Sequence, residues 1–255
     1  GATSGSQTSF DDNVLSVASR DASGNQSEPV TVTVNLLPAS QSDLNIVGLW
    51  HLDGSWHDYS GNGNHGTPVN GASFSTYGIV GSHAGMFDGF DDHTSIPNST
   101  SLHSSRNLTI TGWIYTNRLD KEWQAIYWKG NTPDCVTGCD NREYSLWLNS
   151  AGYLVLASTP DHRIGIGQLL VETPQGAVQA GKWYYVTAVI SADLGVMKIY
   201  IDGVERASAP YSSSNIRTTT GPLIMGNSPY PGINTSFNGR VDELAIYGRA
   251  FAASE

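Results

Sequence analysis

Apolar and polar residues alternate along most of the chain after residue 45, and short stretches rich in Gly, Asn and Ser separate the alternating runs. A period of two places every second side chain on one face of a β-strand. The pattern therefore predicts a series of strands that fills this part of the chain. The predicted strands span residues 46–52, 85–96 with a central turn, 108–115, 125–129, 144–148, 153–157, 183–190, 196–201, 223–226 and 237–247.

The turn residues between these runs predict tight connections between antiparallel strands. Asp202-Gly203 between two apolar runs is the strongest short hairpin signal in the chain. No segment shows convincing helical periodicity except a turn at 250–255. About a dozen short strands with such turns predict an all-β, two-sheet antiparallel jelly-roll sandwich. Within 108–115, Gly112 is expected to shift the alternation so that Trp113 joins the apolar side.

The first 36 residues have a pattern of their own. Residues 14–20 and 30–34 alternate, and the stretch between them is rich in turn residues, which predicts a hairpin. Two strands alone are marginally stable, so the hairpin is interpreted as the end of an upstream module. Residues 37–44 are predicted to be a linker, and 45–255 the main domain.

The composition of the chain limits the classes of partner that it is expected to bind. Apolar residues make up 39% of the chain and charged residues only 14%, while the net charge is −10. Nucleic acid is an unexpected partner, because phosphate binding needs clustered Lys and Arg. No apolar run reaches the roughly 18 residues of a membrane span, so membrane insertion is not expected. A monomer within a multi-domain chain is the expected state.

Two cysteines stand four residues apart, at Cys135 and Cys139. A disulfide between them would close a small loop and fits an oxidising compartment. A zinc site would need two further soft ligands, and none stand at finger or ribbon spacing. The disulfide is favoured, and with it a secreted or cell-surface location.

The loop 50–66 carries short oxygen-bearing side chains between glycines: Asp53, Asp58, Asn62 and Asn64. Calcium binds six to eight oxygens at flexible angles, so such a loop is a candidate cation site. The alternative is a polar surface loop whose Asn and Gly residues adopt left-handed turns. A second, weaker candidate for a cation loop has three acidic residues: Asp88, Asp91 and Asp92.

Several segments together resemble a known family. They are Leu-Asp-Gly at 52–54, 58–66, 86–92, 108–114, 181–186, 199–203 and 237–247. Their order resembles the laminin G-like, concanavalin A-like jelly-roll family of bacterial extracellular proteins. The resemblance implies a two-sheet sandwich, often with a structural calcium, that is used for carbohydrate binding or adhesion. The hairpin before it resembles the last two strands of a fibronectin type III or immunoglobulin-like module.

The resemblance also implies that the first and last strands of the domain lie side by side, which would bring Asp242 to the opening loop. Asp53, Asp58, Asn64 and Asp242 are then expected to share one calcium ion. The alternative is structural: Asp242 caps a strand end, and Asp58 starts an Asx-turn.

Aromatic side chains suit a sugar site, because ring faces stack on sugar rings while polar neighbours bind the hydroxyls. Trp113 and Trp183 match buried positions of the family and are expected in the core. The ligand site is expected around the insertion 129–143, which Trp128, Tyr144 and Trp147 flank, and around the facing loop 226–236. Asp140-Asn141 resembles the pair that holds ligand-bridging calcium in pentraxins, but the partner loop in this chain lacks the acidic residues that pentraxins use for that ion. The predicted ligand residues are Trp128, Asp140, Asn141, Arg142, Tyr144, His162, Arg163, Asn227 and Tyr230.

The sequence contains only weak signs of a catalytic site. A retaining glycosidase on a strand needs acids at alternating positions, whereas Asp242 and Glu243 are adjacent and Glu143 is isolated. No Gly-x-Ser-x-Gly elbow occurs. The sequence therefore predicts a non-catalytic module of a secreted multi-domain protein that binds a polysaccharide or glycan. The alternatives are an adhesive or structural surface module and, third, a glycosidase or lyase domain.

Overall fold

The structure of the protein is a computed structural model. It describes residues 45–131, 142–160, 168–230, 234–253 and 255, together with the backbone of 13–17 and 30–34. The chain divides into two units, residues 1–43 and 44–255. In the first unit, β1 (Asn13–Val17) pairs antiparallel with β2 (Val30–Val34). Its assignment to a fibronectin-like module stays a prediction.

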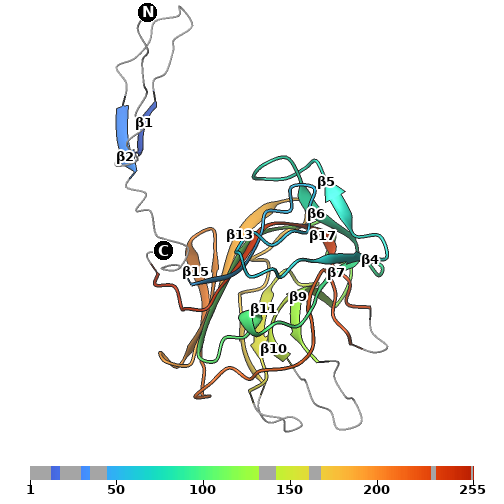
Figure 1. Cartoon of the computed structure of the whole chain (residues 1–255), viewed down its shortest axis with the longest axis vertical. Helices are drawn as coiled ribbons and strands as arrows, with labels where there is room; N and C mark the ends of the chain where they lie inside the picture. The colour runs from blue at the N-terminus through green and yellow to red at the C-terminus, as the bar shows by residue number, and fades with distance from the viewer. Residues whose placement is uncertain are drawn as a thin grey trace, which may run out of the picture. The chain divides into compact units, whose positions relative to one another are not determined.

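The second unit contains two large antiparallel sheets, as the alternating pattern predicts (Figure 1). One is eight-stranded, and seven of its strands lie in the order β15 (Val204–Pro210), β14 (Val196–Ile201), β13 (Trp183–Ser191), β8 (Asn107–Thr116), β17 (Asn238–Tyr247), β6 (Ala84–Asp88) and β5 (Ser73–Ser75). The eighth strand, β3 (Ile46–Trp50), also pairs with β17. The first and last strands of the unit are therefore neighbours.

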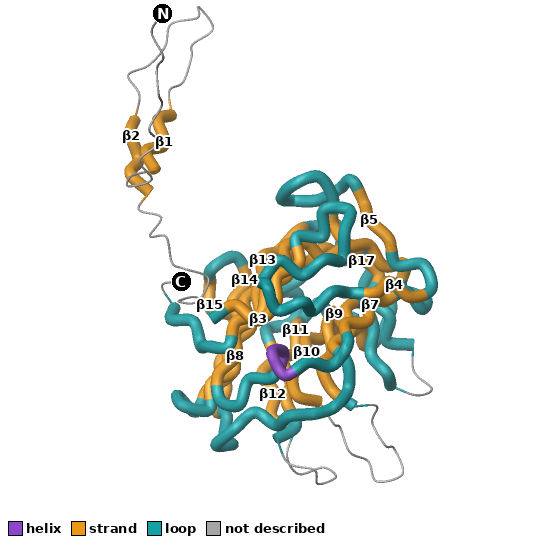
Figure 2. Tube along the Cα trace, in the orientation of Figure 1, coloured by secondary structure: helices purple, strands orange, loops and turns teal. Residues whose placement is uncertain are grey.

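The other sheet is seven-stranded. Its order is β12 (Leu169–Glu172), β11 (Leu154–Ser158), β10 (Arg142–Asn149), β9 (Trp123–Gly130), β16 (Leu223–Met225), β7 (His93–Ile96) and β4 (Thr67–Val69). Figure 2 draws the short 3-10 helix η1 (Thr100–Leu102) in purple, and the described chain contains no other helix. Two antiparallel sheets with almost no helix confirm the predicted all-β sandwich.

The core lies between the inner faces of the two sheets. Apolar residues two apart on β8, such as Leu108 and Ile110, meet those of β10, such as Leu146 and Leu148, in one buried cluster. The Asp202-Gly203 hairpin is also confirmed, because both residues have positive φ angles of 52° and 76° between the paired strands β14 and β15. This is the backbone that a two-residue type I′ turn requires.

The expected shift at Gly112 is wrong. Strand β8 pairs with β13 in unbroken register from Asn107 to Tyr115, and Ile114 stays on the core side. Trp113 therefore points to the outer face of the eight-stranded sheet, and Trp183 faces outward by the same alternation. Both side chains are half-buried there and are not core residues, which corrects the expectation.

Two irregularities of the seven-stranded sheet decide which side chains reach its outer face. On β9, Tyr127 pairs with Leu146 and Ala125 with Trp147, so Ile126 is an extra residue. On β10, Arg142 pairs with Gly130 and Tyr144 with Lys129, so Glu143 is extra. A bulge of this kind places an additional residue in one strand and changes the phase of its alternation.

Candidate functional site

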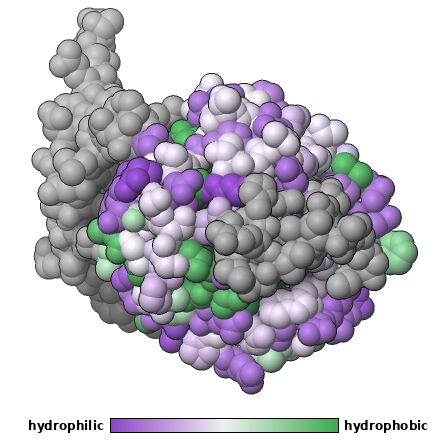
Figure 3. Space-filling model, turned by 90° about the horizontal axis from the view of Figure 1, so that it is seen from below, coloured by the Kyte–Doolittle hydropathy of each residue, from purple (hydrophilic) through white to green (hydrophobic). Residues whose placement is uncertain are grey.

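A second apolar cluster lies on the outer face of the seven-stranded sheet. It contains the buried residues Ala125, Trp128, Trp147, Val155 and Ala157, and it is separate from the main core. Three partly buried aromatic residues pack against it: Trp123, Tyr153 and Tyr230. An apolar cluster on an outward sheet face marks a candidate interaction site. Figure 3 views the molecule from below, where described apolar residues gather among hydrophilic ones.

A pocket of about 320 Å³ opens on this cluster. Its volume lies at the lower end of the range for small-molecule sites, roughly 300–1,000 Å³. The lining combines aromatic walls with a few polar groups, as such sites require. The lining residues are Trp123, Arg142, Trp147, Val155, Gln168, Leu170, Glu172, Tyr230 and Thr235.

The aromatic rings beside the pocket form an edge-to-face arrangement. The ring centroids of Trp128 and Trp147 are 5.9 Å apart at 84°, and those of Trp128 and Tyr230 are 5.6 Å apart at 82°. Trp123 meets Trp147 at 6.5 Å and 86°. Edge-to-face pairs at these separations are favourable and hold each ring in one orientation. The walls are therefore rigid.

Arg142 is the cation at the pocket. Its guanidinium carbon lies 5.1 Å from the ring centroid of Trp128, 5.7 Å from that of Trp147 and 5.9 Å from that of Tyr230. Its Nη2 donates a hydrogen bond of 2.9 Å to the Tyr230 hydroxyl. Cation–π contacts strengthen when the charge is desolvated, and Arg142 is only 5% exposed. The guanidinium is thus fixed in place.

The rim of the pocket is polar and exposed on the β12 side. Gln168, Leu170 and Glu172 lie on or beside this edge strand. Burial raises the pKa of the Tyr153 hydroxyl, and the nearby charge of Glu172 raises it further. On the opposite side, the Thr235 hydroxyl donates to Asn227 Oδ1 at 3.0 Å. The pocket thus has a fixed wall and a more open polar edge.

The structure brings two predicted ligand residues, Arg142 and Tyr230, into the pocket. Trp128 lies fully buried beneath Arg142. Asn227 accepts from Ser228 and Thr235 and so holds the base of the loop that carries Tyr230. The other predicted ligand residues, Asp140, Asn141, His162 and Arg163, lie outside the described residues, as does the predicted disulfide Cys135–Cys139.

Tyr144 corrects the predicted set. It shares the phase of Leu146 and Leu148 on β10 and belongs to the main core. Its hydroxyl donates to the Leu102 carbonyl at 3.2 Å, on the side away from the pocket. A fully buried tyrosine with a satisfied hydroxyl cannot stack on a ligand, so Tyr144 is a packing residue.

The pocket residues on or beside β12, Gln168, Leu170 and Glu172, are not predicted from the sequence. Leu169–Glu172 is short and largely exposed, and its apolar pattern carries no clear alternation. Trp123 was also missed, because it precedes the predicted strand. Trp123 and Trp128 are an odd number of residues apart, so in a regular strand they would lie on opposite faces. The extra residue Ile126 brings them to the same face, and the sequence does not reveal this bulge.

The predicted calcium shell divides into two separate networks. In the first, Asp58 is 3% exposed and accepts from the backbone N–H groups of Leu49, Ser60 and Asn64 at 2.8–2.9 Å. The Ser60 hydroxyl donates to its second oxygen. Asn64 is buried as well, and its amide donates to the Val47 carbonyl and the Ser101 hydroxyl. These groups satisfy each other, so Asp58 and Asn64 do not fit a cation shell.

The second network contains Asp53 and Asp242, which bind the same loop. Asp242 Oδ2 accepts from Ile79 N at 2.8 Å and Val80 N at 3.1 Å. Asp53 Oδ1 accepts from Ser82 N and His83 N, and its carboxylate lies against the α-carbon of Gly81, where a Cβ would meet it at 2.0 Å.

The two carboxylate oxygens of Asp242 differ in their hydrogen bonds. It is 0% exposed, and within the described part of the chain its Oδ1 has no hydrogen-bond partner. Burial raises the pKa of this carboxyl, and the charge of Asp53 adds to the rise. A buried carboxylate oxygen needs a donor or a cation. The open oxygen of Asp242 therefore fits a hard cation such as calcium, and the charge of Asp53 acts on the same carboxyl group.

The other acidic group is compact. Asp88, Asp91 and Asp92 present oxygens within 4.8 Å of one another. Asp92 Oδ2 accepts from Asp88 N, and Asn238 donates to the Asp88 carbonyl, so backbone bonds already order this turn. A cation there stays a prediction.

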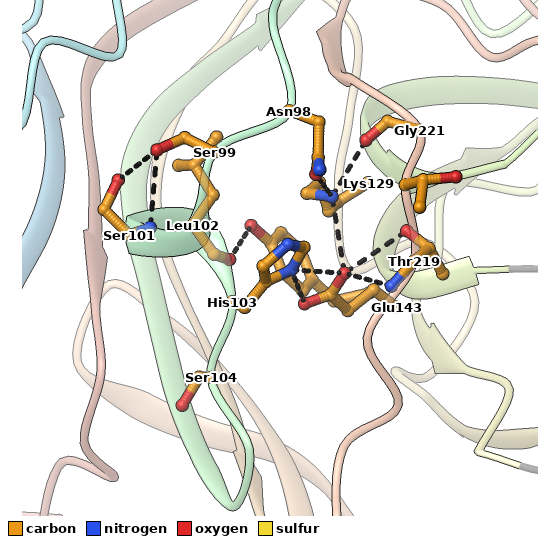
Figure 4. A network of polar contacts seen from close by, with 12 residues as sticks. Asn98, Ser99, Ser101, Leu102, His103, Ser104, Lys129, Glu143, Thr219 and Gly221 are labelled. Carbon is orange, nitrogen blue, oxygen red and sulfur yellow. Dashed lines mark hydrogen bonds and ion pairs between the residues drawn. The ribbon is translucent and has the colours of Figure 1, made fainter.

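A buried ionic network lies beside the pocket strands (Figure 4). Glu143 follows Arg142, but the bulge turns its side chain inward. Its carboxylate contacts His103 Nδ1 at 2.9 Å and Lys129 Nζ at 3.3 Å, and it accepts from Thr219 N at 3.1 Å. Lys129 Nζ also donates to Asn98 and to the Gly221 carbonyl. Burial lowers the pKa of Lys129, and the Glu143 charge opposes that shift.

Glu143 stands isolated in the sequence, because its partners are 14 to 76 residues away along the chain. The network joins β9 and β10 to the loops that carry His103 and Thr219. It fixes the strand ends from which the pocket is built.

No helix in the described chain is long and apolar enough to cross a membrane.

The family model for the concanavalin A-like lectin/glucanases superfamily, of laminin G type, matches residues 87–255. This is well over half of the chain. The chain belongs to this superfamily. The predicted resemblance is thereby confirmed for the main domain. No curated protein sequence matches the chain.

Solved structures of binding domains share the superfamily fold. Domain 4 of AbnA, a GH43 extracellular arabinanase from Geobacillus stearothermophilus in complex with arabinotriose, has a TM-score of 0.57 at 19% identity over 82% of this chain and 95% of that one. The binding domain of Paraclostridial Mosquitocidal Protein 1 has a TM-score of 0.63 at 18% identity over 82% and 50%. The binding domain of botulinum neurotoxin DC, in complex with SialylT, has 0.62 at 13% over 84% and 50%. The chain thus spans about half of these two toxin domains.

Proposed function

We propose that residues 44–255 form a non-catalytic carbohydrate-binding module of a secreted protein, and that it holds a glycan in the pocket on the seven-stranded sheet. The observation that carries the proposal is the aromatic wall of Trp123, Trp147 and Tyr230 beside the fixed guanidinium of Arg142. Neighbours of the same fold that were solved with oligosaccharides support the ligand class.

The chemistry of the pocket matches a sugar better than a purely apolar ligand. Sugar rings carry C–H groups that pack on aromatic faces, while their hydroxyls need fixed donors and acceptors at the edge. The rim supplies such groups through Gln168, Glu172 and Thr235. Because the edge-to-face ring contacts already hold the walls in one orientation, binding requires little ordering of the protein.

The absence of catalysis is also part of the proposal. A glycosidase of the common type needs two carboxyl groups across the scissile bond. Among the lining residues, Glu172 is the single carboxylate. An adhesive or structural surface module is the second candidate, and it predicts a pocket that binds no polysaccharide. A glycosidase or lyase domain is the third.

A structural calcium would be held by Asp53 and Asp242, with backbone carbonyls completing its shell. When bound, it would supply positive charge to the unpartnered Oδ1 of Asp242. The protein groups already bind the loop 79–83 from two sides, so the ion would rigidify this loop. The ion is thereby proposed as part of the scaffold, away from the glycan pocket.

The test is affinity electrophoresis in gels that contain arabinan, xylan or a β-glucan, followed by calorimetry on the best polysaccharide. Trp123→Ala should weaken binding at least tenfold, about 1.4 kcal/mol, because it removes one pocket wall. Tyr59→Ala is the matched control, since Tyr59 is an exposed aromatic residue outside the pocket. Tyr230→Phe should weaken binding less, since it removes only the hydroxyl that Arg142 contacts.

Equal affinity in Trp123→Ala and the wild-type protein would refute the pocket. No retardation of the wild-type protein on any polysaccharide would support the adhesive alternative. Release of reducing sugar would support the enzyme.

A further inference from the structure

A row of large side chains crosses the outer face of the eight-stranded sheet, opposite the pocket. Trp183 on β13 pairs directly with Tyr115 on β8, and Tyr115 pairs directly with Arg240 on β17. Direct pairs on one face stand close enough for their side chains to touch. The centroids of Tyr115 and Trp183 are 5.4 Å apart, and the Arg240 guanidinium carbon lies 4.9 Å from the Tyr115 ring.

Tyr77 extends this row from the loop that follows β5. Its ring meets Tyr115 at 5.5 Å and 81°, and the Arg240 guanidinium also stacks over it at 5.4 Å. Tyr77 is nevertheless 54% exposed, so much of its ring surface is accessible. The loop that carries it is bound by Asp242 and Asp53 two to six residues further on, which restricts where Tyr77 can lie.

A second row lies beside the first. Trp113 pairs directly with Tyr185, and their ring centroids are 5.2 Å apart. The two rows are two residues apart along β8, which is about 7 Å. Trp113, Tyr115, Trp183 and Tyr185 are all half-buried rather than covered. The rings therefore form a surface two rows deep rather than a single isolated pair.

Fixed polar groups border the rings. Arg240 Nε donates to the Ser75 hydroxyl and Nη1 donates to Asn117 Oδ1, both at 3.0 Å. The guanidinium thus lies over the Tyr77 and Tyr115 rings, and two polar side chains fix its position. Cross-strand aromatic pairs also stabilise a sheet by themselves, so packing alone is the competing explanation. That explanation does not require Tyr77 to be exposed or the guanidinium to be held at the surface.

We propose that Tyr77, Tyr115, Trp183, Arg240 and the adjoining pair Trp113–Tyr185 form a second carbohydrate-binding site. Its occupant is an extended polysaccharide chain, because a shallow surface of several rings contacts successive sugar units, whereas the pocket suits one or two. The rim of Arg240, Asn117 and Ser75 supplies hydrogen bonds to hydroxyl groups. An apolar protein segment would make no use of this polar border, whereas sugar hydroxyls can both donate to it and accept from it. The site goes beyond the proposed pocket and lies on the opposite sheet.

The experiment follows the tryptophan indole N–H signals of ¹⁵N-labelled protein during titration with arabinohexaose, xylohexaose and cellohexaose. Trp183→Phe and Trp147→Phe assign the two reporter signals. The Trp183 Nε1 atom is buried without a hydrogen-bond partner in the described chain, so its signal reports on its immediate surroundings. With a hexasaccharide that binds, the Trp183 signal should shift and saturate, and it should still do so in Trp123→Ala.

Tyr77→Ala should weaken the saturation of the Trp183 signal at least tenfold and leave that of Trp147 unchanged. Tyr77 is an exposed loop residue, so this variant is expected to fold. In affinity gels, the double variant Trp123→Ala/Tyr77→Ala should lose more retardation than either single variant.

A shift of the Trp147 signal alone, at a stoichiometry of one, would overturn the second site and leave the pocket intact. A shift of the Trp183 signal alone would support the second site and refute the pocket. No shift of either signal with any of the three hexasaccharides would overturn the second site as stated.

Discussion

Glu143 and Asp242 are two fully buried carboxylates in one domain, and their surroundings differ sharply. Glu143 meets an imidazole, an ammonium group, a backbone N–H and a hydroxyl. Asp242 receives two backbone N–H groups on one oxygen, while its other oxygen has no hydrogen bond of normal geometry among the described residues, although the Glu243 backbone N–H acts on the carboxylate. Both are 0% exposed, so neither can rely on solvent.

The difference distinguishes a buried acid whose partners all lie within the protein from one that still needs a bound partner. A buried charge is tolerated when its partners satisfy it, and removal of one partner is strongly destabilising. Glu143 is complete within the chain and needs nothing further. Asp242 is incomplete, which supports a cation as its missing partner. Asp58 belongs with Glu143 in this respect, because both of its oxygens accept hydrogen bonds.

The largest effect is expected at Glu143. Glu143→Gln leaves Lys129 Nζ buried without its counter-charge, and it should lower the free energy of unfolding by about 3–5 kcal/mol. Urea denaturation measures this change. Glu122→Gln is the control, because Glu122 has an exposed side chain. Equal stability of the two variants would show that the network contributes little.

The next effect distinguishes Asp242 from the satisfied acids. Calcium at 100 times its dissociation constant should raise the stability of the wild-type protein by about 2.7 kcal/mol, since it binds only the folded state. Asp242→Asn should abolish this gain without lowering stability in EDTA. Thermal melts with and without chelator provide the measurement. An unchanged melting temperature in the wild-type protein would remove calcium from the scaffold.

Asp58→Asn should give a smaller loss that does not depend on calcium. The amide retains one acceptor oxygen, so donors on the other oxygen lose their partner, and the expected loss is about 1–3 kcal/mol. The same melts, compared with and without calcium, test it. A loss that appears only in calcium would instead return Asp58 to the cation shell.

The smallest effect is a pH dependence in EDTA. The pKa of Asp242 is raised in the folded state by burial and by Asp53. Its contribution to stability is therefore fully present below the unfolded pKa of about 3.8 and is lost as the pH rises through the folded value. The stability of the wild-type protein relative to Asp242→Asn should fall as the pH rises from 3.5 to 7. Denaturation at several pH values measures it, and a flat difference would contradict the burial argument.

The fold was largely predictable because alternation and turn chemistry are local. The strand pattern and the Asp202-Gly203 turn predict the sandwich and one hairpin without any knowledge of long-range contacts. The edge strands β4, β5 and β12 were not predicted, since they are short and expose much of their surface. Such strands form because a neighbour offers unpaired backbone groups, and sequence alone does not display that neighbour.

The site was less predictable. Arg142 and Tyr230 were identified from their position beside an aromatic insertion, and both line the pocket. Tyr144 has the same proximity to the insertion, but it shares the alternation of Leu146 and therefore packs in the core. The sequence does not show that the four expected calcium ligands belong to two separate networks. The backbone N–H groups that bind Asp58 become its neighbours only in the folded chain.

The extra residue Ile126 also sets the spacing of the tryptophans in the outer apolar cluster. Trp123 and Trp128 are an odd number of residues apart, so in a regular strand they would face opposite sides. The bulge allows both to serve one cluster. Removal of Ile126 would restore regular alternation with both tryptophans still outward, but one residue closer together. The spacing of the rings in this cluster can therefore change by one residue while each ring stays on the same face of the sheet, which gives related sequences a simple way to reshape the floor and wall of the site.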